Sequence, residues 1–228
     1  MREGLVLSDS VVLFRPRISS RMRTDREGLD IEQQVAHLRG ALTLLTVGHG
    51  TLSSGELVGL LEGAGVKQVI DVRSAPGSRR HPHFSRSKME CWLPAAGIGY
   101  RWEPELGGFR RPLAGSLNTG LRHASFRGYA DYMESISFGV AFERLLDDCS
   151  RRRTAVMCAE SLWWRCHRRL IADAAVLAGG ASVWHLGHEH RLTAHRVTDA
   201  VRTVEMAGIT RLIYDVGTPG HSRSGSPA

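Results

Sequence analysis

Two cysteines eight residues apart lie in the stretch of the chain richest in reactive side chains, residues 154–172. The apolar run that ends at Cys158 is typical of a buried strand, and Cys166 and His167 precede a segment whose apolar residues recur at helical spacing. A helix amino terminus offers unpaired N–H groups and a positive dipole end, which bind anions and lower the pKa of a nearby thiol. The pattern therefore predicts a strand, a loop and a helix, with thiol chemistry at the crevice where open parallel sheets bind ligands.

Polar side chains also follow other expected strands. His49 follows the apolar run 42–47, and Asp71 and Arg73 come at the end of the run that begins at Val69. Each of them, taken alone, is as well explained by a turn or a helix cap. Because parallel strands end on the same side of a sheet, we expect these groups to converge on one crevice with the thiols. A buried Asp71 would need a partner, and Arg73 or backbone N–H groups are expected to supply it.

These residues divide into two candidate groups. One cysteine would act as a nucleophile or redox thiol, Glu160 or His167 would transfer protons, and arginines would hold an anion, since guanidinium groups bind phosphate in a bidentate manner. The candidate catalytic residues are Cys158, Cys166, Glu160, His167 and Asp71. The candidate ligand-binding residues are His49, Arg73, Arg79, Arg80, Arg168 and Tyr129.

Two more specific sites are less well supported. From Cys158 to Arg165 the spacing is C-x6-R, one residue longer than in cysteine phosphatases, and the loop lacks glycines that would curl backbone N–H groups around a phosphate. Cys158, Cys166, His167 and His49 would suit zinc, but seven residues between the cysteines is not a zinc-finger spacing. We therefore assign no metal-binding residues, and the sequence does not identify a cofactor. Cys91 and Cys149 lie on expected helices, where core packing is the simpler interpretation.

Composition sets wider limits on function. The formal charge of +7 favours an anionic small molecule or nucleic acid as partner, although an arginine-rich genome would give the same charge. No apolar run approaches the ~20 residues of a membrane span, and four cysteines are too few for a disulfide framework. We expect a cytoplasmic protein without a membrane partner.

The expected elements that must position these residues alternate between strand and helix. Strands are expected at 42–47, 69–72, 98–102, 155–158 and 181–186, and helical spacing recurs between them, for example over 129–149. This order predicts an α/β fold, a Rossmann-like, open and mostly parallel five-stranded sheet with helices on both faces. Residues 1–40 would form an irregular extension, 41–203 a single α/β domain, and 204–228 a tail with a disordered end. The aperiodic segment 104–127 is long for a connection and is therefore expected to be functional or mobile.

A series of short motifs in a fixed order accompanies this pattern. They are Val47-Gly48-His49, Asp71-Val72-Arg73 with Pro76 and Ser78-Arg79-Arg80, Leu106-Gly107-Gly108, residues 128–133, Met157-Cys158-Ala159-Glu160 and residues 166–172. Together they resemble a family of bacterial and archaeal proteins known as domain of unknown function 488, over about residues 43–203. The resemblance implies a compact α/β domain and no assigned activity. The residues then favour a thiol-based site that binds or acts on a phosphate-bearing ligand, such as a nucleotide or nucleic acid; the alternatives are a non-catalytic nucleic-acid-binding module and a Cys/His metal-binding protein.

Overall fold

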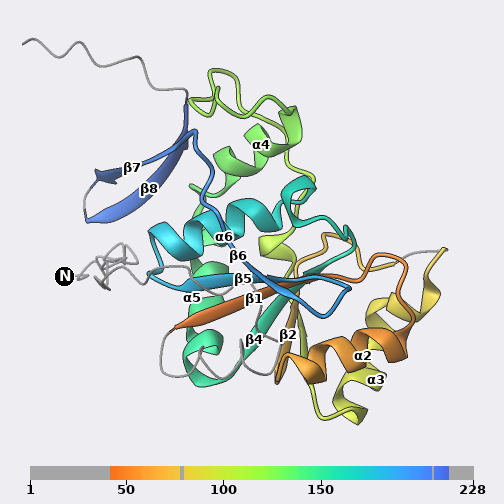
Figure 1. Cartoon of the computed structure of the whole chain (residues 1–228). Coiled ribbons are helices and arrows are strands. Elements are labelled where there is room, and N and C mark those ends of the chain that lie inside the picture. Colours follow the sequence, from red (N-terminus) through yellow and green to blue (C-terminus); the bar gives the residue numbers. More distant parts are fainter. Residues whose placement is uncertain (1–41, 78–79, 207, 216–228) are drawn as a thin grey trace, which may run out of the picture.

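A computed structural model describes residues 42–77, 80–206 and 208–215 of the chain (Figure 1). The expected extension 1–40, Arg79 and the chain after residue 215 lie outside these residues. The strands are β1 (Thr43–Gly48), β2 (Gln68–Asp71), β3 (Gly99–Trp102), β4 (Thr154–Cys158), β5 (Ser182–Leu186), β6 (Leu192–Ala194), β7 (Val201–Met206) and β8 (Ile209–Tyr214). The α-helices are α2 (Ser54–Gly63), α3 (Arg86–Ala95), α4 (Ala124–Tyr132), α5 (Ile136–Arg151) and α6 (Arg168–Leu177). Short 3-10 turns cover Pro82–Phe84, Pro104–Leu106 and Trp163–Arg165.

The main sheet has the order β3-β2-β4-β1-β5-β6. The five strands expected from the sequence are all present and parallel, which confirms the fold class. The sheet also has a sixth strand, β6, which pairs antiparallel with β5. This strand was not expected, because the histidine-rich segment around it shows no strand pattern in the sequence. Strand β4, which ends in Cys158, lies between β1 and β2 in the middle of the sheet.

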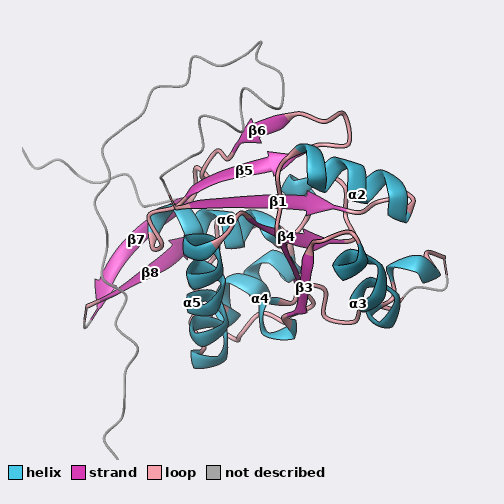
Figure 2. Ribbon diagram, turned by 90° about the horizontal axis from the view of Figure 1, so that it is seen from below, coloured by secondary structure: helices cyan, strands magenta, loops and turns pink. Residues whose placement is uncertain are grey.

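Helices cover both faces of this sheet (Figure 2). On one face α2 and α3 pack against side chains such as Leu45 and Val47 of β1. On the other face α4, α5 and α6 pack against a second cluster that includes Leu44. Burial on both faces explains why β1 and β4 are continuous apolar runs rather than alternating patterns. None of the helices in the described ranges is long and apolar enough to cross a membrane.

One helical expectation needed correction at its boundaries. The helical spacing over 129–149 belongs to two helices, because Ser135 accepts a hydrogen bond from the backbone N–H of Phe138 and caps the start of α5. Helix α3 includes Pro94 one residue before its end, so the missing N–H donor affects only the last turn. On α3, Cys91 is exposed rather than packed in the core, whereas Cys149 on α5 is buried.

The segment after β6 forms the hairpin β7–β8, which contacts α4. Its last residue, Tyr214, is fully buried, and the hydroxyl donates to Asp173 Oδ2 on α6 at 3.0 Å. Asp173 also accepts hydrogen bonds from Thr198 and from His195 Nε2 at 2.9 Å, and His195 Nδ1 lies 2.9 Å from His185 Nε2 on β5. This buried chain of hydrogen bonds joins α6, β5 and the hairpin into one body.

The middle of the aperiodic segment 104–127 is bound by the carboxylate of Asp131. Asp131 on α4 accepts from the backbone N–H of Leu113, the hydroxyl of Ser116 and the side-chain amide of Asn118, at 2.6–2.8 Å. Phe109, in the same segment, has a positive φ of 60° and is 95% exposed. Between the 3-10 turn Pro104–Leu106 and the start of α4, the chain is therefore ordered by side-chain hydrogen bonds and not by a helix or strand, which is why it has no periodicity.

Candidate functional site

Cys158 is the last residue of the central strand β4 and is positioned by its neighbours on both sides. Its partner across β1 is Gly48, and its carbonyl accepts a hydrogen bond from the backbone N–H of His49 at 2.9 Å. On the other side, Val72 donates its backbone N–H to Met157. The ends of β1, β2 and β4 therefore bring His49, Asp71 and Cys158 to one end of the sheet, as the strand pattern predicts.

Gly48 allows the chain after Cys158 to turn back tightly over β1. A Cβ atom at this position would lie 1.9 Å from the backbone oxygen of Glu160 and 2.8 Å from Cα of Ser161. Only glycine permits such an approach between two backbone segments. The loop that follows can then return toward the sheet and deliver Cys166 next to Cys158.

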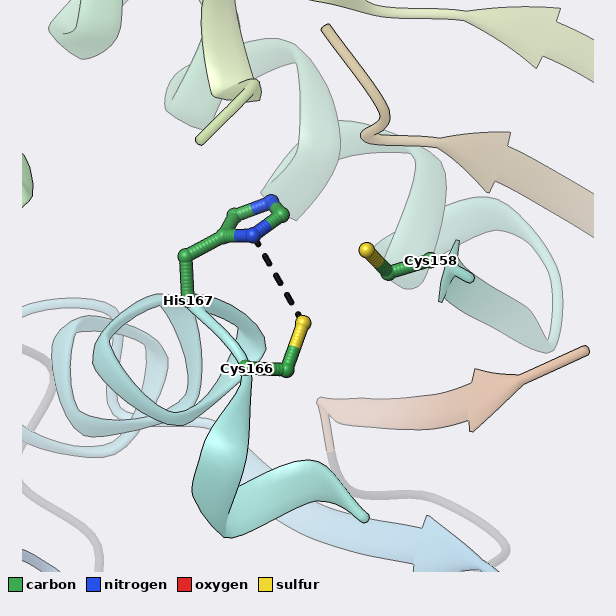
Figure 3. A group of neighbouring side chains, drawn as sticks. All are labelled: Cys158, Cys166 and His167. Carbon is green, nitrogen blue, oxygen red and sulfur yellow. Dashed lines mark hydrogen bonds between the residues drawn. The ribbon is translucent and has the colours of Figure 1, made fainter. Parts of the chain in front are cut away.

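Cys166 precedes α6 by two residues and lies beside both Cys158 and His167. The sulfur atoms and a ring nitrogen of His167 lie within 4.8 Å of one another, and Figure 3 shows the three side chains facing each other. His167 Nε2 is 3.0 Å from the carbonyl oxygen of Val72, so this nitrogen carries a proton and donates it. The other nitrogen, Nδ1, lies 3.5 Å from Cys166 Sγ, close enough to take the proton of that thiol.

Arg168 supplies a buried positive charge to the same thiol. It is 1% exposed, its Nε atom lies 3.4 Å from Cys166 Sγ, and one of its terminal nitrogens donates to the backbone oxygen of Glu160. Within the described ranges no carboxylate forms an ion pair with Arg168. Since an isolated buried charge is costly, a Cys166 thiolate is the counter-ion that best satisfies this guanidinium.

The two thiols consequently differ in acidity. The hydrogen bond from Cys158, followed by the charge of His167 and its hydrogen bond, and by Arg168, holds the pKa of Cys166 well below its ordinary value, against the opposing effect of burial. The same hydrogen bond, together with burial, raises the pKa of Cys158 well above its ordinary value. Of the two thiols, Cys166 is therefore the one that ionises more readily, and Cys158 is its hydrogen-bond donor.

A second buried cluster lies beside the thiols and holds Asp71. Its carboxylate is fully buried and accepts from Arg73 Nε at 2.8 Å, from Arg73 Nη2 at 2.6 Å and from the hydroxyl of Tyr100 at 2.7 Å. The partner expected for Asp71 is thus present, and Tyr100 on the neighbouring strand is an additional one. Arg73 Nη1 lies 3.3 Å from His49 Nε2, and His49 Nδ1 donates to the carbonyl of Gly50. Burial and then the charge of Arg73 lower the pKa of His49 to about 4, so His49 is neutral at pH 7.

The thiols open onto a pocket of about 910 Å³. Its walls come from the ends of β2 and β4, the loop before α6, the segment around Gly108 and the start of α4. The lining residues are Gly50, 73–75, Gly108, Phe109, His123, Ser125, Phe126, Tyr129, 158–161 and 164–167. Tyr129 is buried, donates its hydroxyl to the carbonyl of Leu106, and has a pKa raised by burial, so it forms a neutral wall.

The expected site residues are distributed unevenly around this pocket. Cys158, Glu160, Cys166, His167, Arg73 and Tyr129 line it, whereas His49, Asp71, Arg80 and Arg168 do not. Asp71 and His49 lie behind Arg73, and Arg168 lies buried behind Cys166. Arg80 is exposed outside the pocket, and Arg79 lies outside the described residues.

Several lining residues were not among the sequence candidates. Arg165 is exposed and makes no ion pair with a carboxylate of the described ranges; it had been considered only for its spacing from Cys158. Gly108, Phe109, His123 and Phe126 come from the aperiodic segment and the start of α4. The expected functional importance of 104–127 pointed to this region, but no local pattern distinguished the individual residues.

The Cys158–Cys166–His167 cluster also meets the distance requirements of a soft metal ion. A thiolate and an imidazole nitrogen 3.5 Å apart could bind the same zinc ion, and the hydrogen bond from His167 Nε2 would orient the ring. The buried Arg168 guanidinium at Cys166 argues against this use, because its charge already compensates one thiolate and would repel a cation. We therefore interpret the cluster as a reactive thiol pair.

The family model described as domain of unknown function DUF488 matches residues 53–175, from the start of α2 into α6, a range that contains both thiols and His167. The chain belongs to the DUF488 family. The expected resemblance is thus confirmed, and it carries no assigned activity. No curated protein and no solved structure matches the chain. For this DUF488 protein, function has to be argued from the site itself.

Proposed function

We propose that this DUF488 protein is a thiol-dependent enzyme in which Cys166 attacks an electrophilic centre of a small anionic ligand bound in the pocket. The observation that carries the proposal is the placement of Cys166 Sγ. It lies 3.4 Å from the buried Nε atom of Arg168 and 3.5 Å from Nδ1 of His167, and Cys166 lines the pocket. A thiolate, and not a thiol, is the nucleophile in cysteine enzymes, and neighbouring cations favour it.

His167 is suited to proton transfer at this thiol. Because Nε2 donates to the carbonyl of Val72, Nδ1 faces Cys166 as the basic nitrogen and can accept the thiol proton. The proton can later return to a leaving group in the pocket. Glu160 is exposed and also lines the pocket, so it can exchange protons with solvent.

Arg165 is the group that favours an anionic ligand. Its guanidinium is exposed and lines the pocket one residue before the nucleophile, whereas the Arg73 guanidinium is already bonded to Asp71. Arg165 is therefore the group best able to pair with a carboxylate or phosphate on the ligand. Arg73 then acts as a rigid wall, held from behind by Asp71 and His49.

Two alkylating reagents of similar size test the nucleophile and the anion preference together. Iodoacetate carries a carboxylate and iodoacetamide is neutral; each is attacked by the thiolate, forms a C–S bond and releases iodide. The rate ratio of iodoacetate to iodoacetamide at Cys166 would be measured by peptide mass spectrometry in a Cys91→Ser background, which removes the exposed thiol. Arg165→Gln should lower this ratio by up to about fivefold, since an exposed ion pair contributes up to about 1 kcal/mol.

The matched control is Arg80→Gln, which removes an exposed arginine outside the pocket and should leave the ratio unchanged. If the rate ratio falls equally in Arg165→Gln and Arg80→Gln, the preference for iodoacetate comes from the overall charge of the protein and not from Arg165. If Cys166 alkylates no faster than Cys149 at pH 7, the nucleophile itself would be refuted.

A further inference from the structure

The two pocket cysteines differ in a way that suits a redox couple. Cys166 contacts the Arg168 guanidinium and His167 Nδ1, which favour its thiolate, and the sulfur atom of Cys158 lies within 4.8 Å of it. Both line the same pocket, so a small oxidant reaches them from one opening. Cys91 and Cys149 lie on α3 and α5 and do not line it. The arrangement provides an attacking sulfur next to a second sulfur that can resolve the product.

We propose that Cys166 and Cys158 reduce hydroperoxides, with Cys166 as the attacking cysteine and Cys158 as the resolving cysteine that closes a reversible disulfide. This activity rests on the same thiolate as the proposed function. It is independent of Arg165 and of the anionic ligand.

The chemistry proceeds in two balanced steps. The Cys166 thiolate attacks the terminal oxygen of the hydroperoxide, the O–O bond breaks, and the departing alkoxide or hydroxide takes a proton from His167 or water, which leaves a sulfenic acid. The Cys158 sulfur then attacks the Cys166 sulfur, the S–O bond breaks, and hydroxide leaves with the Cys158 proton as water. Two thiols supply the two electrons that reduce the peroxide, and an external dithiol returns the protein to its reduced form.

The loop between the cysteines explains how the sulfur atoms can meet. Gly48 lets the chain turn immediately after Cys158, and the 3-10 turn Trp163–Arg165 returns it to Cys166. Closing the disulfide removes the negative charge that Arg168 faces. The oxidised loop should therefore rearrange near Trp163, which stacks on His185 at 3.9 Å between ring centroids, and its fluorescence offers a second signal.

The test uses the full chain with Cys91→Ser. The protein is treated with one equivalent of hydrogen peroxide, the remaining thiols are blocked with N-ethylmaleimide, and the intact mass and peptides are measured. We expect that neither Cys158 nor Cys166 takes up maleimide after the peroxide treatment and that the two appear as one disulfide-linked peptide pair. Reduction with dithiothreitol before labelling should restore both maleimide adducts. With Cys158→Ser added, Cys166 should instead be trapped by dimedone as a sulfenic acid.

Several outcomes would overturn the proposal. Retention of both maleimide adducts, or conversion of Cys166 to sulfinic acid while Cys158 stays reduced, would each show that no resolving step occurs. Cys158→Ala serves as a second variant if Cys158→Ser does not fold, which circular dichroism checks. Rapid alkylation of Cys166 without disulfide formation would refute the redox couple but not the nucleophile. If the disulfide forms but Arg165→Gln leaves the iodoacetate-to-iodoacetamide rate ratio unchanged, only the proposed anionic ligand would be refuted.

Discussion

The Nε atom of Arg168 lies 3.4 Å from the Sγ atom of Cys166, and both side chains are buried. A buried guanidinium and a thiolate each remove the cost of placing the other in a low-dielectric interior. This contact therefore contributes both to the acidity of the thiol and to the burial of the arginine, alongside Cys158 and His167.

Replacing the arginine should make the thiol less acidic. Arg168→Met keeps most of the apolar stem but removes the charge and the N–H donor, so the pKa of Cys166 rises. A hydrogen bond to a charged group contributes about 1.5–3 kcal/mol, which corresponds to an upward shift of about 1–2 pH units in the alkylation profile. The profile would be measured with iodoacetamide in the Cys91→Ser background. Arg169→Met is the control, since Arg169 bonds Thr198 instead of the thiol, and an unchanged profile in folded Arg168→Met would contradict the assignment.

The glycine beneath the thiol loop should tolerate no side chain. Gly48→Ala places Cβ against the backbone of Glu160, which must move, and we expect a loss of about 1–3 kcal/mol in the free energy of unfolding. Gly59→Ala, on α2, meets nothing within 4 Å and should instead stabilise by about 0.5–1 kcal/mol. Urea unfolding of the two variants gives both values. Equal stability of Gly48→Ala and the unmodified protein would mean that the loop does not lie against β1.

His49 should make the fold sensitive to acid. Its pKa is lowered from 6.5 to about 4 in the folded protein, so the unfolded chain binds the proton more readily between these values. Stability should therefore fall as the pH falls from about 6.5 to about 4, by at most about 3 kcal/mol from this residue. His49→Gln removes the titrating group, and its stability deficit relative to the unmodified protein should shrink over that range. The control His123→Gln replaces an exposed histidine and should lose as much stability on acidification as the unmodified protein. If the stability difference between His49→Gln and the unmodified protein does not change with pH, His49 is not the source of the acid sensitivity.

The C-terminal hairpin should depend on one hydroxyl. Tyr214→Phe keeps the buried ring but removes the hydrogen bond to Asp173, at a cost of about 1.5–3 kcal/mol for a bond to a charged group. Hydrogen exchange should accelerate over β7 and β8 more than over β1. Tyr132→Phe removes a hydroxyl that bonds the less buried Glu105 and should have a smaller effect. Unchanged exchange in the hairpin of Tyr214→Phe would show that apolar packing alone holds it.

The sequence by itself determined the five parallel strands, the family and the position of the thiols. Apolar runs and helical spacing are local properties, and parallel strands must end on one side of their sheet, so Cys158 and His49 could be placed together without coordinates. The expected pairing of Asp71 with Arg73 was also correct, because the two residues are only two positions apart and their contact is local. β6 was missed, since three residues among histidines and arginines carry no strand pattern of their own.

Only the tertiary structure decided which way the arginines point. Arg165 and Arg168 are three residues apart near the start of α6, yet one is exposed at the pocket and the other is buried behind Cys166. Arg165 ends the 3-10 turn before α6 and Arg168 begins the helix, and their spacing in the sequence does not fix how deeply either side chain is buried. That depth depends on the turn over Gly48 and on the segment around Gly108, which lie far away in the sequence. The same long-range packing set the order β3-β2-β4, which brought the hydroxyl of Tyr100 to Asp71.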